Sequence, residues 1–100
     1  YTTDEICATV GAKQAIFNSI MALVDPGDEV LLPVPCWVSY TEMIKFAGAK
    51  PVFVDVEAET FDLDIEALEK AVTTKTKAIV ICTILIIQLE LFIAKVLCVN

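Results

Sequence analysis

Apolar residues recur at helical spacing in the first quarter of the chain. From Ala12 to Asp25 no Gly or Pro interrupts the run, and Asp25-Pro26-Gly27-Asp28 then supplies turn residues. A repeat of three and four positions is typical of a helix with one buried face. We therefore predict a helix from Ala12 to this turn, preceded by a short extended segment over 6–10. Its apolar face consists of Ala15, Ile16, Ile20, Leu23 and Val24, widened by Phe17 and Met21.

Three short apolar runs farther along have the length of buried strands. Gly48 suits the residue after a helix C-terminus, and Asp64 suits an N-cap, so two more helices are expected between the strands. The expected strands are 29–32, 50–56 and 77–81; the expected helices are about 37–47 and 64–72, and 33–36 is expected to form a rigid extended loop. This alternation predicts an α/β fold with a mainly parallel sheet and right-handed crossovers.

Charge and cysteine content narrow the classes of function. The chain has 100 residues and a net charge of −7, which argues against nucleic acids and anionic membrane surfaces as partners. Four cysteines occur without any histidine, and no pair has the close spacing of a zinc or redox site, so no metal is expected. We expect free, mostly buried thiols in a reducing, cytoplasmic compartment. Because the N-terminal residues are polar, we expect no signal peptide.

The start of the first predicted helix is the main candidate site. Gly11 stands at the corner, and Lys13 lies in the first helical turn. Helix N-termini carry unpaired N–H groups and partial positive charge, so this corner suits a phosphate. The alternative is an ordinary helix start after a glycine, with Lys13 pointing into water.

Four blocks of sequence together resemble a known family. They are Val10-Gly11-Ala12-Lys13-Gln14-Ala15, Asp25-Pro26-Gly27-Asp28-Glu29-Val30, Pro35-Cys36-Trp37-Val38-Ser39-Tyr40 and Thr74-Lys75-Thr76-Lys77-Ala78-Ile79. In order and spacing they resemble the large domain of class I pyridoxal-phosphate aminotransferases, the aspartate aminotransferase-like group. The resemblance covers about Glu5 to Ile81. It implies part of the large domain of the type I pyridoxal-phosphate transferase fold, over residues 1–81, in a homo-oligomer that transfers an amino group between an amino acid and a 2-oxo acid.

The resemblance also implies roles for single residues. Gly11, Ala12 and Lys13 match the cradle for the phosphate of pyridoxal 5′-phosphate. Lys13 also matches a position that, in some members, contacts the distal carboxylate of an acidic substrate such as aspartate or glutamate. Trp37 matches the aromatic side chain that stacks on the pyridine ring and helps to position the substrate. Without the resemblance, Trp37 is better explained as a core anchor beneath the proline-rich loop.

Some features of the family are missing. Cys36 stands where the family usually has Tyr. The Schiff-base Lys, the Asp that pairs with the pyridine nitrogen and the substrate-clamping Arg have no counterpart here, and Lys75 and Lys77 fall at ordinary loop and strand positions. We therefore assign no catalytic residue and expect no transaminase activity from this chain alone. The alternatives are a non-catalytic truncated module that self-associates and a piece of a longer enzyme.

Residues 82–100 form a hydrophobic tail that departs from the family. Where the family carries Pro-Asn-Asn-Pro-Thr-Gly, this chain has Ile84-Leu85-Ile86-Ile87-Gln88-Leu89-Glu90. The codons ATC CTA ATA ATC CAA CTG GAG encode the observed residues, and reading them from the third base gives the family motif. We therefore expect a frameshift near Cys82 or Thr83.

Two other interpretations of the tail are open. The mostly apolar run 78–99 is long enough to span a bilayer, although Gln88 and Glu90 make that costly. Alternatively, the tail forms a buried strand followed by an amphipathic helix over 89–96.

Overall fold

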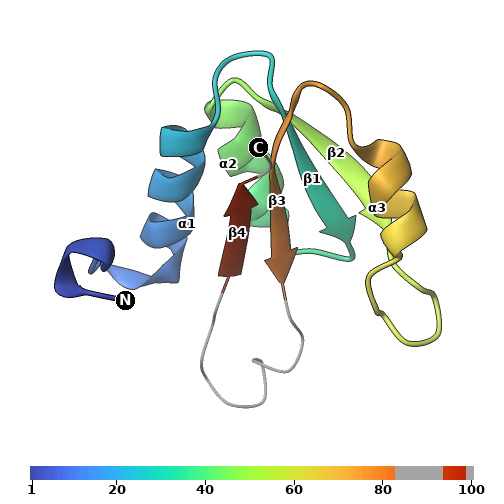
Figure 1. Ribbon diagram of the computed structural model, residues 1–100, viewed down its shortest axis with the longest axis horizontal. Helices are drawn as coiled ribbons and strands as arrows, with labels where there is room; N and C mark the ends of the chain where they lie inside the picture. Colours follow the sequence, from blue (N-terminus) through green and yellow to red (C-terminus); the bar gives the residue numbers. More distant parts are fainter. Residues whose placement is uncertain (83–93, 99–100) are drawn as a thin grey trace.

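The computed structural model describes residues 1–82 and 94–98, and in them helices alternate with strands (Figure 1). The α/β class expected from the sequence is confirmed. The elements in chain order are η1 (Thr3–Glu5), α1 (Gly11–Leu23), β1 (Glu29–Val34), α2 (Val38–Phe46), β2 (Lys50–Asp55), α3 (Ile65–Ala71), β3 (Thr76–Cys82) and β4 (Ala94–Cys98).

The strands form one sheet in the order β2-β1-β3-β4. β1 pairs in parallel with both β2 and β3, as the alternating pattern predicts. β4 pairs with β3 in the antiparallel direction, so the described sheet has a fourth strand besides the three parallel strands expected. The amphipathic helix that one interpretation of the tail places over 89–96 is wrong for residues 94–96, which are extended, and the rest of that helix lies outside the described residues.

The core lies between the sheet and two of its helices. α1 and α2 cover the face that carries Val30, Leu32, Ala78 and Val80, all of them at most 1% exposed. α3 packs against β2, and the carboxylate of Asp64 accepts the Ala67 N–H at 2.9 Å, which confirms the predicted N-cap. The helices contribute mainly Ile16, Ile20, Tyr40, Met43 and Ile44 to the core.

Two segments differ from the expectation. β1 continues through Pro33, which was expected in a loop, because the pairing of β1 with β3 ends at Leu31 while the pairing with β2 continues to Val34. At Pro33, β1 is paired with β2 only. Because β3 makes no ladder hydrogen bond at this position, the missing N–H of Pro33 costs no bond to β3. Residues 6–10 form no strand, and a 3₁₀ turn precedes them instead.

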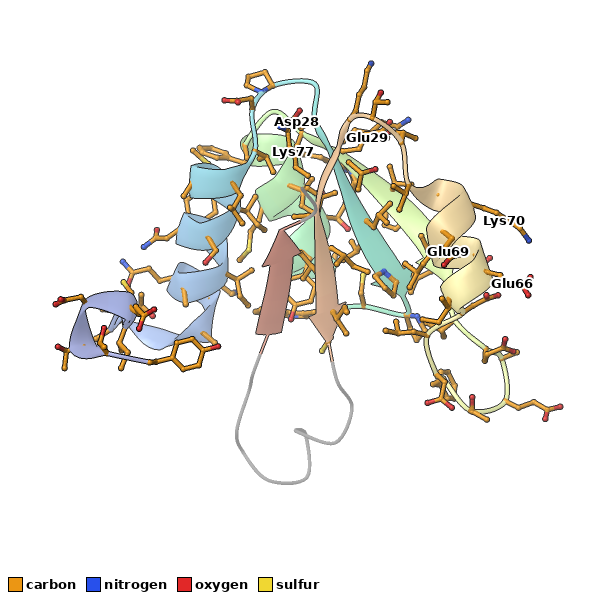
Figure 2. All side chains as sticks on the ribbon, in the orientation of Figure 1. Asp28, Glu29, Glu66, Glu69, Lys70 and Lys77 are labelled. Atoms are coloured by element: carbon orange, nitrogen blue, oxygen red, sulfur yellow. The ribbon has the colours of Figure 1, made fainter. Side chains whose placement is uncertain are left out.

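Polar side chains link the amino ends of β1 and β2 to the loop that precedes β3. One carboxylate oxygen of Glu29 accepts the Thr73 hydroxyl at 2.7 Å, and the other lies 3.7 Å from Nζ of Lys50. We call Glu29, Lys50 and Thr73 the amino-end clasp; Figure 2 shows Glu29 at that end of the sheet. The clasp fixes the start of β1 against β2 and against the loop that enters β3.

Candidate functional site

The predicted site lies at the end of the sheet opposite the clasp. β1 and β3 run in the same direction, and the N-terminus of α1 lies toward their carboxyl ends (Figure 1). In parallel α/β sheets this is the edge at which ligands bind. The topology therefore places the Gly11 corner and the loop after β1 at the edge where a cofactor site is expected.

The first turn of α1 has the features of an anion site. Gly11 has a φ of +79°, and a Cβ added there would meet no atom within 4 Å. The N-cap residue Val10 offers no side-chain cap, and the first turn contains no acidic residue. The backbone N–H of Val10 donates to Oε1 of Gln14 at 2.6 Å, which fixes the chain as it enters the helix. The exposed N–H groups that follow Gly11 are thus left to a ligand or to water.

Lys13 and Trp37, far apart in the sequence, meet in the structure. Nζ of Lys13 lies 4.7 Å from the centroid of the Trp37 ring, within the range of a cation–π contact. Trp37 precedes α2 and packs edge-on against Tyr40, with ring centroids 5.6 Å apart. Of the predicted site residues, Gly11, Ala12 and Lys13 form the helix start, and Trp37 joins them through Lys13.

The alternative role for Trp37, that of a core anchor, is wrong. Its side chain is 38% exposed, whereas Tyr40 is completely buried among the core residues. Tyr40 therefore anchors α2 on the sheet, whereas Trp37 is partly exposed at the start of that helix.

Sequence reasoning missed a second group of residues at this edge. The hydroxyl of Tyr40 is buried and has no hydrogen-bond partner among the described residues, and the polar groups that act on it are the thiols of Cys82 and Cys36. Burial raises the pKa of Tyr40 well above its ordinary value, and both thiols add to that shift. Burial also raises the pKa of Cys36, with Cys82 contributing. Tyr40 lies within the helix expected over 37–47, but no sequence signal connects it with Cys82.

The cysteines are more accessible than expected. The described thiols of Cys7, Cys36 and Cys82 are free, but Cys7 is exposed and the other two are half-buried. No group of three potential metal ligands occurs among the described residues, and no helix found there is long and apolar enough to cross a membrane.

Comparison with known proteins tests the resemblance. The model of the DegT/DnrJ/EryC1/StrS aminotransferase family matches residues 1–85. The chain belongs to this family. The match includes the Gly11 corner, Trp37 and all three parallel strands of this aminotransferase-family chain, and it ends close to the start of the hydrophobic tail.

Similar proteins carry aspartate aminotransferase names. A probable aspartate/prephenate aminotransferase of Rickettsia typhi is 48% identical over 82 residues, which are 81% of this chain and 21% of that protein. A bifunctional aspartate aminotransferase and glutamate/aspartate-prephenate aminotransferase of Petunia hybrida is 44% identical, over 83% of this chain and 18% of that protein. The expected resemblance to aspartate aminotransferases is thus confirmed.

Solved structures of aspartate aminotransferases are also similar to this chain. The crystal structure of the aspartate aminotransferase from Rhizobium meliloti matches with a TM-score of 0.75 and 44% identity, over 79% of this chain and 20% of that one. The chain thus spans about a fifth of the length of the relatives it matches. The expected α/β fold, with helices and three parallel strands, matches the fold of this aspartate aminotransferase.

Proposed function

We propose that this chain supplies the cofactor corner of an aminotransferase that uses pyridoxal 5′-phosphate to move an amino group between an amino acid and a 2-oxo acid. The observation that carries the proposal is the contact between Lys13 and Trp37, because it joins a helix start suited to an anion to a partly exposed aromatic ring. Pyridoxal phosphate has the matching parts, a phosphate and a flat electron-poor ring.

The residues present fit this cofactor. The glycine with positive φ leaves space at the helix start, where a phosphate would meet unpaired N–H groups and no opposing carboxylate in the first turn. The ring of Trp37 offers a surface for stacking. The bound cofactor supplies the electron sink of the reaction, and the protein binds and orients it. Lys13 adds a cation that favours a dicarboxylic substrate such as aspartate or glutamate, in line with the names of the relatives.

A titration that uses the single tryptophan tests the site. Pyridoxine 5′-phosphate is the probe, because it has no aldehyde to react with other lysines, and Trp37 fluorescence reports stacking. We expect saturable quenching that inorganic phosphate competes away. The Lys13→Gln variant should weaken it severalfold, whereas Lys45→Gln on the exposed side of α2 should leave it unchanged. Linear, non-saturable quenching in the wild type contradicts the proposal.

We further propose that residues 82–100 are read out of frame, while residues 1–81 belong to the cofactor-binding large domain. The end of the family match at residue 85 supports this boundary. Sequencing of the DNA across Ile84 to Glu90 tests it, and codons other than ATC CTA ATA ATC CAA CTG GAG contradict it.

A second candidate function is that of a self-associating, non-catalytic module. β2 lies at an edge of the described sheet, and its Phe53 side chain is 56% exposed. Unpaired strand edges with apolar side chains favour association. Light scattering should then detect oligomers that Phe53→Lys dissociates, whereas Phe61→Lys, at a similarly exposed loop position, does not. A monomer at all concentrations excludes this candidate.

A further inference from the structure

The half-buried thiols of Cys36 and Cys82 lie at the carboxyl ends of adjacent strands. The parallel pairing of β1 with β3 ends at Leu31 and Ile79, and both strands continue from there toward their carboxyl ends. Cys82 is the last residue of β3, and Cys36 follows the end of β1 by two residues. Topology alone therefore brings these two cysteines to the same edge of the sheet.

The side chains of Cys36 and Cys82 contact the same core cluster. Both pack against the hydrophobic core cluster that contains Tyr40, and both thiols act on the buried hydroxyl of Tyr40. The charge of one thiol also acts on the other, since Cys82 contributes to the raised pKa of Cys36. Strand order and shared core packing thus bring Cys36 and Cys82 to the same edge of the sheet around Tyr40, and the effect of Cys82 on the pKa of Cys36 agrees with this placement.

We propose that Cys36 and Cys82 form a redox-active pair, which a peroxide converts reversibly into an intramolecular disulfide at the base of the Trp37 loop. One thiolate attacks hydrogen peroxide, which breaks the O–O bond and gives a sulfenic acid and water. The second thiol attacks that sulfur, forms the S–S bond and releases another water. Two thiols are oxidised and one peroxide is reduced to two waters; an external dithiol restores the reduced pair.

The location gives the bond a structural effect. Cys36 precedes Trp37 directly, and Tyr40 anchors the following helix beneath both thiols. A disulfide there ties the loop after β1 to the end of β3. Oxidation should therefore change the environment of the only tryptophan, which makes the state of the pair visible by fluorescence.

Peptide mapping after oxidation of the folded, full chain tests the proposal. We expect hydrogen peroxide to remove two of the four thiols and to yield a linked peptide that contains Cys36 and Cys82, with a shift of Trp37 emission that dithiothreitol reverses. Cys36→Ser and Cys82→Ser should each abolish the link and the shift. The matched control Cys7→Ser, at an exposed thiol before α1, should retain both.

Several results overturn the proposal. They are retention of all four thiols, a link through Cys7 or Cys98, or a link between two chains. Circular dichroism of each variant establishes that it is folded, and Cys36→Ala and Cys82→Ala replace any serine variant that is not. Oxidation in urea provides the comparison: a pairing that is as frequent in the unfolded chain as in the folded one contradicts a pair selected by the fold.

Discussion

The hydroxyl of Tyr40 gives a direct test of how the core is built. The side chain is 0% exposed, and its oxygen has no hydrogen-bond partner among the described residues. Leaving a buried hydroxyl unpaired costs about 1–3 kcal/mol. The thiols of Cys36 and Cys82 are weak acceptors and recover part of this cost, so the lower end of the range applies.

Tyr40→Phe removes the hydroxyl and keeps the ring in the core. We expect the free energy of unfolding to rise by about 1 kcal/mol, which is roughly a fivefold change in the folding equilibrium. Urea unfolding followed by circular dichroism measures the change, as a higher midpoint at an unchanged slope. Tyr1→Phe is the matched control, because Tyr1 is fully exposed and its hydroxyl should contribute less than about 0.5 kcal/mol.

The opposite result refutes the reasoning. If Tyr40→Phe lowers the free energy of unfolding by about 1 kcal/mol or more, the hydroxyl is a satisfied donor in the folded chain. Tyr40→Ala separates the ring from the hydroxyl and should lose about 3–5 kcal/mol, because it leaves a cavity where α2 meets the sheet.

Three further predictions concern caps, glycines and pH. Asp64→Ala should lose about 1 kcal/mol in urea unfolding, since it removes the N-cap bond of α3; no change would contradict that cap. Gly48→Ala should lower the melting temperature more than Gly27→Ala, because both have positive φ but only the Cβ at residue 48 meets Pro26, at 3.3 Å; equal losses would exclude that contact as a cause. Because the pKa of Tyr40 is raised by folding, its contribution to stability is complete below about pH 10, where the unfolded side chain ionises, and falls at higher pH. Melting curves from pH 8 to 11 should therefore decline more steeply for wild type than for Tyr40→Phe, and parallel declines would contradict the shift.

Local patterns predicted most of the fold. The apolar repeat before Asp25 predicted α1 to within a residue or two, and Gly48 and Asp64 marked the ends of helices as the structure has them. These signals work because helix ends and buried faces depend on residues close together in the chain. Pro33 was placed in a loop because its tolerance in β1 depends on which neighbours pair with the strand, and only the three-dimensional register contains that information.

The sequence predicted which residues belong to the candidate site but not how they are arranged in space. Motif resemblance selected Gly11, Lys13 and Trp37, yet it did not reveal that the Lys13 ammonium lies over the indole ring. Tyr40, and not Trp37, anchors α2 in the core. Helix α2 turns the Tyr40 side chain inward, whereas Trp37 is the partly exposed N-cap residue. The pairing of Cys36 with Cys82 depends on strand order, which no local spacing in the sequence records.

The amino-end clasp and the candidate site lie at opposite ends of the sheet. Glu29, Lys50 and Thr73 hold one end of the sheet together, while Lys13 and Trp37 lie at the other. Substitutions at distant sites without shared partners usually have additive effects. Changes at the clasp should therefore alter how well the chain folds without altering what the opposite edge binds. Variants of this chain can therefore be designed to change ligand binding at one edge while the other edge keeps the sheet intact.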